Sequence, residues 1–526
     1  MVTASPQPRG YDLIGFGDEV PGILALVSAA REYRHRQGRY PRSLLMFKGN
    51  SRDGVGGHLV RGGLSYLDRS HVPPEIRKAQ GLDTFGDPAA IYQEFLKRAQ
   101  VKLIGLDPRL GDEALRAMLQ EAQVTMLSNI EIESVVSEGD RIHWICLTNG
   151  DTYQAKQFID ATVNAELAQF AGVPKYPGFG VMGLPEAELS VTLTFETEGL
   201  SLDRLKRTEL HYLNRFADSQ DAEAQSWIKI AAGGNAAMAT RLRQSLRNAS
   251  GQLQSMYVGV DYIDIPTKAL SIAYHAFRGT SLDLRRTAAV LDNGNVARLS
   301  GGRLSWNALL FDVNAAQAEA LARGKAKPTT AMLAEMEQVK QWFLHCLGAT
   351  VVRPAQELYI RHAGNVMAVN QPLSGAAMLA GGVPAGEAFG TFGYHFDVRG
   401  GIAGLGHRAI AKGLQEVSPL HPPLFNIGMQ HALVKTVRNL AVVSPASGFD
   451  GYACSAGRIV EFNVAVGQGV GIAAAIALSH NRQLADITNL EVRQVLEGRG
   501  LRSRVYGRSN AVAATQLGDF ERQIVA

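Results

Sequence analysis

The sequence is poor in cysteine. Only Cys146, Cys346 and Cys454 occur in 526 residues, and no two of them form a Cys-x-x-Cys pair. Three isolated cysteines exclude a disulfide scaffold and argue against a zinc or iron–sulfur site built from cysteine pairs. His-Glu-x-x-His motifs and calcium-loop spacings of carboxylates are also absent, so we predict no metal site. The cysteine usage is typical of a reducing compartment and predicts a cytoplasmic protein.

The sequence also lacks long runs of one charge and apolar runs of membrane length. Its 53 basic and 49 acidic residues give a net charge of +4, without the clustered basic patch of a nucleic-acid-binding protein. The most apolar stretch, residues 464–478, is shorter than the ~20 residues that a spanning helix needs. Acidic residues at positions 12, 18 and 19 interrupt the N-terminal apolar run. We therefore predict no nucleic-acid partner and no stable membrane insertion.

Glycine, in contrast, is abundant. It accounts for 55 of the 526 residues, against a usual share of about 7%. Such a content favours tight turns and close backbone approaches. The chain length and the 46% share of hydrophobic residues predict a globular protein of two or three lobes.

The N-terminal part predicts an α/β arrangement. Residues 11–15 have the pattern of a buried strand, residues 23–36 that of a helix, and residues 42–49 that of a second strand parallel to the first. A helical region over 87–122 follows, and alternating strands with hairpin turns cover 124–162. After residue 173 the pattern changes and predicts a second lobe, with strands and helices over these ranges: 188–199, 201–252, 300–310 and 315–347.

The turn after the first strand carries part of a dinucleotide-binding pattern. Gly15 and Gly17, with Gly22 arriving two residues late, match half of Gly-x-Gly-x-x-Gly, in which glycines let a pyrophosphate approach the helix N-terminus. Asp18 and Glu19 lie inside this turn, where phosphates would repel them. A plain strand–turn–helix junction also uses glycines, so the pattern alone leaves nucleotide binding open.

The end of the second strand departs from the dinucleotide pattern. An acidic residue usually hydrogen-bonds the ribose at this point, but here the strand ends in Phe47-Lys48. Lys48 and Arg52 could face phosphate instead, and Asp18 or Glu19 could supply the ribose contact. The plainer interpretation is that Phe47 packs in the core.

Three further motifs occur in order along the chain: Gly56-Gly57, Asp160-Ala161-Thr162-Val163-Asn164 and Gly467-Gln468-Gly469-Val470-Gly471. With the stretches "GRLSWNA", "ELYIRHAGN" and "GTFGYHFDVRG" between them, the chain resembles the FAD-dependent oxidoreductases of the glutathione-reductase-like two-dinucleotide-binding superfamily. The resemblance covers about residues 10–500 and rests on the order of the motifs. It implies an α/β fold, in which a Rossmann-like FAD-binding domain (parallel sheet with helices and a small antiparallel sheet) carries an inserted α+β substrate domain.

The resemblance also implies a division of the chain and a set of FAD contacts. The first FAD-binding part, the inserted substrate or cap lobe, and the closing part with the C-terminal helix are residues 1–173, 174–365 and 366–526. The implied contacts to non-covalently bound FAD are Gly15, Gly17, Gly22, Lys48, Gly56, Gly57, His58, Asp160, Ala161, Thr162, Gly467, Gln468 and Gly469. A helix beginning at Val466 or Gly467 would direct its N-terminal N–H groups at the flavin. A glycine–alanine helix packed tightly against a sheet is the alternative.

The candidates for substrate chemistry are Arg361, His362, Tyr394 and His395, because the resemblance implies that their segments lie near the reactive face of the flavin. An arginine could bind a substrate carboxylate bidentately, and a histidine or tyrosine could move a proton during hydride transfer. A hydrogen-bonded structural role is the common alternative for a histidine.

We therefore predict an FAD-dependent oxidoreductase that transfers a hydride or electrons between a small organic substrate and the flavin. The alternative is a catalytically inactive, flavoenzyme-derived ligand-binding or scaffold protein, because the acidic turn, Val163 and the Phe47-Lys48 strand end each weaken a cofactor contact. A third idea, a lipid- or polyene-modifying flavoprotein at a membrane, finds no amphipathic anchor in the sequence. The middle of the chain shows no second dinucleotide pattern, so no dedicated NAD(P)H domain is predicted.

Overall fold

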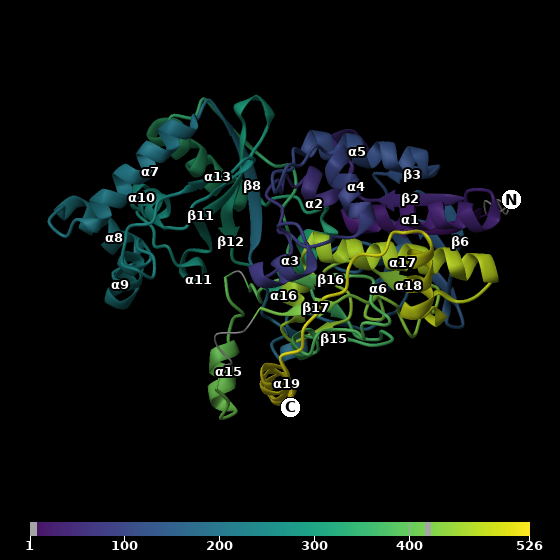
Figure 1. The fold of residues 1–526 in the computed structure, drawn as a ribbon. Helices are drawn as coiled ribbons and strands as arrows, with labels where there is room; N and C mark the ends of the chain where they lie inside the picture. Colours follow the sequence, from purple (N-terminus) through teal and green to yellow (C-terminus); the bar gives the residue numbers. More distant parts are fainter. Residues whose placement is uncertain (1–7, 399, 416–421) are drawn as a thin grey trace.

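The computed structural model describes residues 8–398, 400–415 and 422–526. Two lobes lie side by side (Figure 1). Both chain ends contribute to one lobe, and the middle of the chain forms the other. The chain therefore passes between the lobes twice, once on the way out and once on the way back.

The first lobe is built on a seven-stranded sheet with the strand order β3-β2-β1-β6-β5-β4, and β18 pairs with β6. Its strands are β1 (Arg9–Phe16), β2 (Ser43–Phe47), β3 (Val124–Ser128), β4 (Ile132–Glu138), β5 (Arg141–Leu147), β6 (Thr152–Asp160) and β18 (Leu440–Val442). β1 runs parallel to β2 and β6, and β2 runs parallel to β3, whereas β4, β5 and β6 are antiparallel. The predicted fold class, a parallel sheet with a small antiparallel addition, is confirmed.

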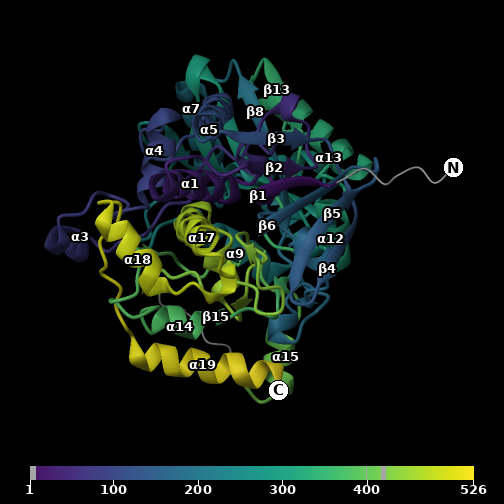
Figure 2. The ribbon, with the colours of Figure 1, turned by 90° about the vertical axis from the view of Figure 1, so that its right-hand side faces the viewer.

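The rest of this lobe is formed by helices from the N-terminal and C-terminal parts of the chain (Figure 2). They are α1 (Val20–Gln37), α2 (Gly57–Val60), α3 (Pro74–Gln80), α4 (Ala90–Arg98), α5 (Pro108–Glu121), α6 (Glu166–Phe170), α14 (Gly375–Leu379), α15 (Leu405–Ala411), α16 (Ala453–Gly457), α17 (Val460–His480), α18 (Asn489–Gly498) and α19 (Ala511–Val525). Short strands complete the lobe: β7 (Lys175–Tyr176), β14 (Asn365–Val366), β15 (Leu373–Ser374), β16 (Thr391–Gly393), β17 (Leu424–Asn426) and β19 (Phe449–Asp450).

Helices α1 and α17 pack against each other with their backbones in close contact. A Cβ atom at Gly467 would lie 2.6 Å from the carbonyl oxygen of Pro21, and one at Gly471 would lie 2.2 Å from that of Ala25. Any larger residue at these positions would push the helices apart, so glycine is required by the packing. The prediction that a helix begins at residue 466 or 467 is wrong, because α17 begins at Val460 and the glycines lie inside it.

Helix α17 has 21 residues and a mean hydropathy of 1.6, which by length and composition alone is enough to cross a membrane. The helix is longer than the apolar stretch 464–478 of the sequence, because it also includes the turn Val460-Glu461-Phe462-Asn463 before it and extends to His480. In the structure, 89% of its apolar window is buried inside the protein. A helix that is apolar on all sides is typical of a protein core, and α17 lies between α1, α4 and α18.

The second lobe is built on a six-stranded sheet with the order β13-β8-β12-β11-β10-β9, and its paired strands are antiparallel. The strands are β8 (Val191–Glu198), β9 (Tyr257–Val258), β10 (Tyr262–Asp264), β11 (Ala289–Arg298), β12 (Leu304–Phe311) and β13 (Val351–Pro354). The helices are α7 (Leu202–Ala217), α8 (Ala222–Ala231), α9 (Ala236–Gln244), α10 (Ala269–Arg278), α11 (Leu284–Thr287), α12 (Ala315–Arg323) and α13 (Thr330–Trp342). The predicted strands and helices of this region are confirmed.

Each lobe has its own hydrophobic core. One buried cluster extends from Val191 to Ala363 and belongs to the second lobe, while two clusters on the main sheet belong to the first. The two crossings between the lobes run just before β8 and just before β14. The second crossing contacts the loop around α2: Glu357 accepts a hydrogen bond from Arg61, and the ring of Tyr359 stacks on His58.

Candidate functional site

The turn between β1 and α1 begins later than the sequence suggests. Gly15 lies inside β1, where it pairs with Leu45 and Ile159, and a Cβ atom on it would press against Leu26. The prediction of Gly15 as the first glycine of the loop is therefore wrong. The strand runs on to Phe16, which is fully buried.

Gly17 and Gly22 restore a loop of normal length. Gly17 has φ of +93°, and a Cβ atom there would lie 2.7 Å from the backbone nitrogen of Thr162. A Cβ atom on Gly22 would lie 2.2 Å from that of Ala161. These are the tight turn and the close helix–strand packing that the first and third glycines of the dinucleotide pattern provide. The second glycine position is occupied by Glu19.

The carboxylates of Asp18 and Glu19 cross the gap to the loop that begins α2. Asp18 accepts hydrogen bonds from the backbone nitrogens of Gly56 (3.0 Å) and Gly57 (3.3 Å). Glu19 accepts one from the backbone nitrogen of His58 (3.2 Å) and forms an ion pair with its Nδ1 atom. Both acidic side chains therefore bind the loop that was expected to face the cofactor.

Arg61 completes this cluster. Its guanidinium binds both carboxylate oxygens of Asp18, at 2.5 and 2.8 Å, and donates from Nε to Glu357 at 2.8 Å. It also lies over the ring of Phe47, 5.6 Å from the centroid. Burial by itself would raise the pKa of Asp18, but the adjacent Arg61 outweighs it and the pKa is lowered. Asp18 is thus held as a carboxylate.

Lys48 does not face open space at the end of β2. Its ammonium group pairs with Glu166 at 3.0 Å and donates to the backbone carbonyl of Arg323 at the end of α12. Burial raises the pKa of Glu166, and the charge of Lys48 opposes that rise. This end of the sheet is therefore covered by the second lobe.

The Asp160-Ala161-Thr162 motif lies against the β1–α1 turn. Asp160 is fully buried and accepts from the backbone nitrogens of Thr162 and Ala168, both at 2.9 Å, and from the hydroxyl of Thr162 at 2.6 Å. Burial raises its pKa to about 6. The motif holds the start of α6 in place, and Ala161 packs on Gly22.

These contacts show whether the pyrophosphate of an FAD fits the crevice, the space between the β1–α1 turn and the α2 loop. In the arrangement described, the backbone donors of Gly56, Gly57 and His58 are already bound to carboxylates, and Glu19 fills the space that a glycine would leave. Two negative charges cannot share this space with a pyrophosphate. The residues as arranged do not fit that part of the cofactor.

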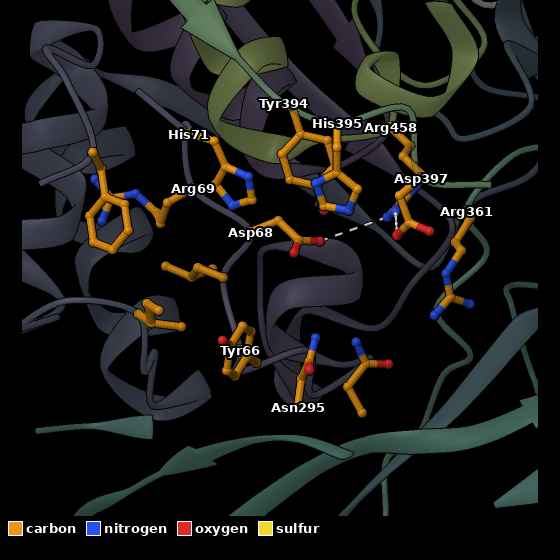
Figure 3. A pocket seen from close by; sticks show the side chains of 14 residues that line it. Tyr66, Asp68, Arg69, His71, Asn295, Arg361, Tyr394, His395, Asp397 and Arg458 are labelled. Atoms are coloured by element: carbon orange, nitrogen blue, oxygen red, sulfur yellow. Dashed lines mark hydrogen bonds and ion pairs between the residues drawn. The ribbon is translucent and has the colours of Figure 1, made fainter. Parts of the chain in front are cut away.

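A cavity of about 200 Å³ opens between the lobes, next to the crevice (Figure 3). Its walls are mainly polar. They are formed by Tyr66, Leu67, Asp68, Arg69, His71, Phe85, Ile104, Asn295, Asn307, Arg361, Tyr394, His395, Asp397 and Arg458. The two asparagines belong to β11 and β12 of the second lobe, and Arg361 lies on the returning crossing. The other lining residues belong to the first lobe.

Arg458, between α16 and α17, anchors one side of the cavity. It donates to Asp397 at 2.6 Å and to the hydroxyl of Tyr359 at 3.1 Å, and it lies 3.7 Å from Asp68 (Figure 3). Nearby, Arg361 donates to the carbonyl of Ser190 at 2.7 Å and stacks over Tyr359. Nε of Arg458 is buried without a hydrogen-bond partner among the described residues.

Aromatic and imidazole rings line the cavity beside Arg458 (Figure 3). His71 stacks on His395 with 5.3 Å between centroids, and Tyr394 lies against both rings. Burial, assisted by the neighbouring His395, lowers the pKa of His71. Burial, assisted by Asp68, raises the pKa of Tyr394 well above its usual range. At neutral pH the site therefore offers a neutral imidazole and a protonated phenol.

The structure brings three of the four catalytic candidates together. Arg361, Tyr394 and His395 line the cavity. His362 does not: it is fully buried, with Nδ1 2.7 Å from Glu188 and Nε2 2.7 Å from Asn365. Burial alone would lower the pKa of His362, but the Glu188 carboxylate raises it well above the usual value. His362 thus forms a buried ion pair outside the cavity.

Several lining residues were not predicted from the sequence, among them Asp68, Arg69, His71 and Arg458. The first three stand in one short stretch, "SYLDRSH", in which an adjacent Asp-Arg pair is followed two residues later by a histidine. That density of polar groups in an extended segment behind the Gly-Gly pair is the signal that could have found them. Arg458 carried no such signal. In the described part of the chain, no group of three or more metal-ligating side chains occurs.

Comparisons with known proteins agree with the fold. A model of the family described as FAD dependent oxidoreductase matches residues 50–496. No curated protein matches the chain at a significant level.

Solved structures show distant similarity. THI4 of Thermovibrio ammonificans is 16% identical, with 32% of this chain and 66% of that chain covered and a TM-score of 0.21. A geranylgeranyl bacteriochlorophyll reductase-like protein of Thermoplasma acidophilum is 9% identical, with 98% and 88% covered and a TM-score of 0.38. A variant of the halogenase PltM in complex with FAD is 11% identical, with 93% and 73% covered and a TM-score of 0.36. At such TM-scores these structures say nothing about the chemistry of this chain.

Proposed function

The chain belongs to the family of FAD-dependent oxidoreductases, and from this premise we propose that it oxidises or reduces a small anionic organic molecule in the cavity between its lobes. FAD is the cofactor of this family. The observation that carries the proposal is that Arg361 and Arg458 line the same cavity as the His71, Tyr394 and His395 rings, with Tyr394 and His395 beside Arg458 (Figure 3). Membership of the glutathione-reductase-like superfamily, the role of residues 174–365 as the substrate lobe, and a cytoplasmic location are parts of the same proposal.

The size of the cavity favours a small substrate. Pockets for drug-sized ligands measure roughly 300–1,000 Å³, whereas this cavity measures about 200 Å³. Its walls come from both lobes, so a molecule inside it contacts both. A small organic acid fits these dimensions better than a lipid or a polyene does.

The buried polar atoms favour an anionic group on the substrate. Nε of Arg458 is a buried donor without a partner in the described part of the chain, and such a donor costs about 1–3 kcal/mol. Oδ1 of Asn307 is a buried acceptor without a partner there, and it suits a hydroxyl or amine donor elsewhere on the substrate. A substrate carboxylate would satisfy the arginine donor. The guanidinium of Arg361 adds a second planar donor set, of the kind that binds carboxylates bidentately.

The rings that line the cavity suit proton movement. Oxidation of an alcohol or amine at carbon also removes a proton from its oxygen or nitrogen, and that proton needs an acceptor. His71, neutral because its pKa is lowered, can accept it at an imidazole nitrogen. Tyr394, whose pKa is raised, keeps its proton and can donate a hydrogen bond to the substrate. His395 stacks on His71 and orients it.

Calorimetric titration of the purified protein with a panel of small carboxylates tests the binding part of this proposal. We expect Arg361→Gln to weaken binding at least tenfold, because a charge-assisted hydrogen bond contributes about 1.5–3 kcal/mol. Arg361→Lys keeps the positive charge but loses the planar guanidinium. Its affinity for carboxylates should therefore lie between those of the unmodified protein and Arg361→Gln. Asn307→Ala, outside the ion pairs, should weaken binding several-fold.

Arg109→Gln is the matched control, because Arg109 lies in the first turn of α5 and does not line this cavity. Melting temperatures show whether each variant is folded. Equal affinity of Arg361→Gln and the unmodified protein for every carboxylate bound would contradict the proposal, as would an absence of carboxylate binding in the folded protein.

The filled crevice favours a second candidate, a flavoenzyme-derived ligand-binding protein that has lost catalysis. Asp18 and Glu19 take up backbone donors of the α2 loop that a cofactor pyrophosphate would need. This candidate binds the carboxylate but no flavin. A visible flavin spectrum that bleaches on reduction of the purified protein excludes it, and a colourless protein that binds carboxylates and does not take up added FAD supports it.

A further inference from the structure

The second glycine of the dinucleotide pattern exists so that the backbone can approach the pyrophosphate. Here Glu19 stands at that position, between Gly17 and Gly22 at the usual spacing. A carboxylate side chain at this point projects into the space that the pyrophosphate would take.

The donors that meet the two carboxylates are the kind that bind phosphate. They are the backbone nitrogens of Gly56, Gly57 and His58 and the guanidinium of Arg61. Carboxylate and phosphate oxygens accept the same charge-assisted hydrogen bonds, and an arginine fork fits both. Two carboxylates also supply two negative charges, as the two phosphates of a pyrophosphate do. The cluster of Asp18, Glu19, His58 and Arg61 is called the carboxylate lock below.

The carboxylate lock is tightly packed. A Cβ atom on Gly57 would lie 2.2 Å from Oε1 of Glu19, so the acidic side chain rests directly on the glycine backbone. The side chains of Asp18 and Arg61 are 6% and 4% exposed. No space for an additional anion remains between the turn and the α2 loop.

The missing ribose contact belongs to the same cluster. Phe47 replaces the acidic residue at the end of β2 and is 1% exposed. The guanidinium of Arg61 lies over its ring. Phe47 therefore supports the arginine that holds Asp18, and two departures from the dinucleotide pattern are explained by one structure.

We propose that the carboxylates of Asp18 and Glu19 take the place of the FAD pyrophosphate. They close the crevice, and FAD must compete with them for the donors of the α2 loop. FAD then loads only when the two carboxylates leave the α2 loop, so its affinity is limited by the carboxylate lock. The inference concerns the cofactor crevice and does not depend on the substrate cavity. It predicts that removing the two carboxylates strengthens FAD binding. If Asp18 or Glu19 instead bound the ribose of FAD, their removal would weaken FAD binding.

The test is a titration of the purified, flavin-free chain with FAD, followed by quenching of flavin fluorescence. We expect Glu19→Gly, which restores the glycine of the pattern, to bind FAD at least tenfold more tightly than the unmodified protein. The double variant Asp18→Asn with Glu19→Gln keeps the shape and removes both charges, and should also bind more tightly. Asp53→Asn, an exposed carboxylate on the same loop, is the matched control and should leave the affinity unchanged.

Three results would overturn the proposal: an unmodified protein that purifies saturated with FAD, weaker FAD binding by the lock variants, or equal absence of binding in all folded variants. Melting temperatures identify a misfolded variant, and Glu19→Gly is the safer one because Glu19 is partly exposed. Titration of the same samples with small carboxylates reports on the cavity separately. Its failure would remove the proposed substrate and leave the carboxylate lock untouched.

Discussion

Buried arginines organise this protein at the scale of single residues. Arg61, Arg69 and Arg458 are each less than 9% exposed. Their carboxylate partners come from distant segments of the chain. Glu461, the partner of Arg69, is 392 positions away from it. Removing one partner of a buried ion pair leaves an uncompensated charge, which typically costs about 3–5 kcal/mol. The carboxylate lock is one of these clusters, so its residues contribute to stability as well as to the closure of the crevice.

Asp18→Asn should lower the free energy of unfolding by about 2–3 kcal/mol at neutral pH, because Arg61 then keeps only Glu357. The pKa of Asp18 is lowered in the folded protein. Its contribution to stability is therefore present above about pH 4, the pKa of an unfolded aspartate, and is lost as the pH falls through the folded value. Urea unfolding of both proteins between pH 7 and pH 3 checks this expectation. A difference in unfolding free energy that stays constant, or grows towards acid pH, would contradict it.

At the scale of secondary-structure elements, the contact between α1 and α17 fixes the first lobe. The two helices come from opposite ends of the chain, and their close approach depends on Gly467 and Gly471. The sequence pattern of these glycines suited two interpretations, a flavin-facing helix start and a glycine–alanine helix packed tightly against a sheet. The structure places the glycines inside α17, which begins at Val460, and packs Gly467 and Gly471 against helix α1.

Gly471→Ala should destabilise the protein by about 1–3 kcal/mol, the cost of overpacking a tight contact. The matched control is Gly498→Ala at the end of α18, where a Cβ atom meets nothing within 4 Å. There the better helix propensity of alanine should stabilise the protein slightly, by up to about 1 kcal/mol. Thermal unfolding distinguishes the two variants, and a rise in melting temperature for both would contradict the packing described.

At the scale of the whole molecule, the two crossings are joined by one buried ion pair. Glu188 lies on the outgoing crossing and His362 on the returning one, and both side chains are 0% exposed. Next to them, His58 of the carboxylate lock stacks on Tyr359, whose hydroxyl accepts from Arg458 in the cavity wall. The crevice, the cavity and the crossings are therefore in direct contact.

His362→Gln should destabilise the protein more at pH 6 than at pH 9. The pKa of His362 is raised in the folded state, so its contribution is fully present below about pH 6.5, the unfolded value, and is lost as the pH rises through the folded value. We expect a loss of about 3–5 kcal/mol at pH 6, measured by urea unfolding. The control is His143→Gln, because His143 on β5 forms an exposed ion pair with Glu138. A larger loss at pH 9 would refute the assignment.

The sequence by itself determined the elements and their order. The β-α-β unit, the hairpins of 124–162 and part of the second lobe follow from local patterns of two- and 3.6-residue period. The elements between residues 253 and 299, among them α10 and β11, were not predicted. These patterns are readable because burial of one face acts on residues that are close in the chain.

Tertiary structure alone decided which charges meet. The inward direction of Asp18 and Glu19 depends on Arg61 and the α2 loop, and the cavity joins His71 to Arg458, nearly 400 positions further along. No local pattern carries this information, because the electrostatic energy of a buried charge is set by partners that the fold brings near it. The same reason explains why the sequence indicated a cofactor crevice and only the structure showed what fills it.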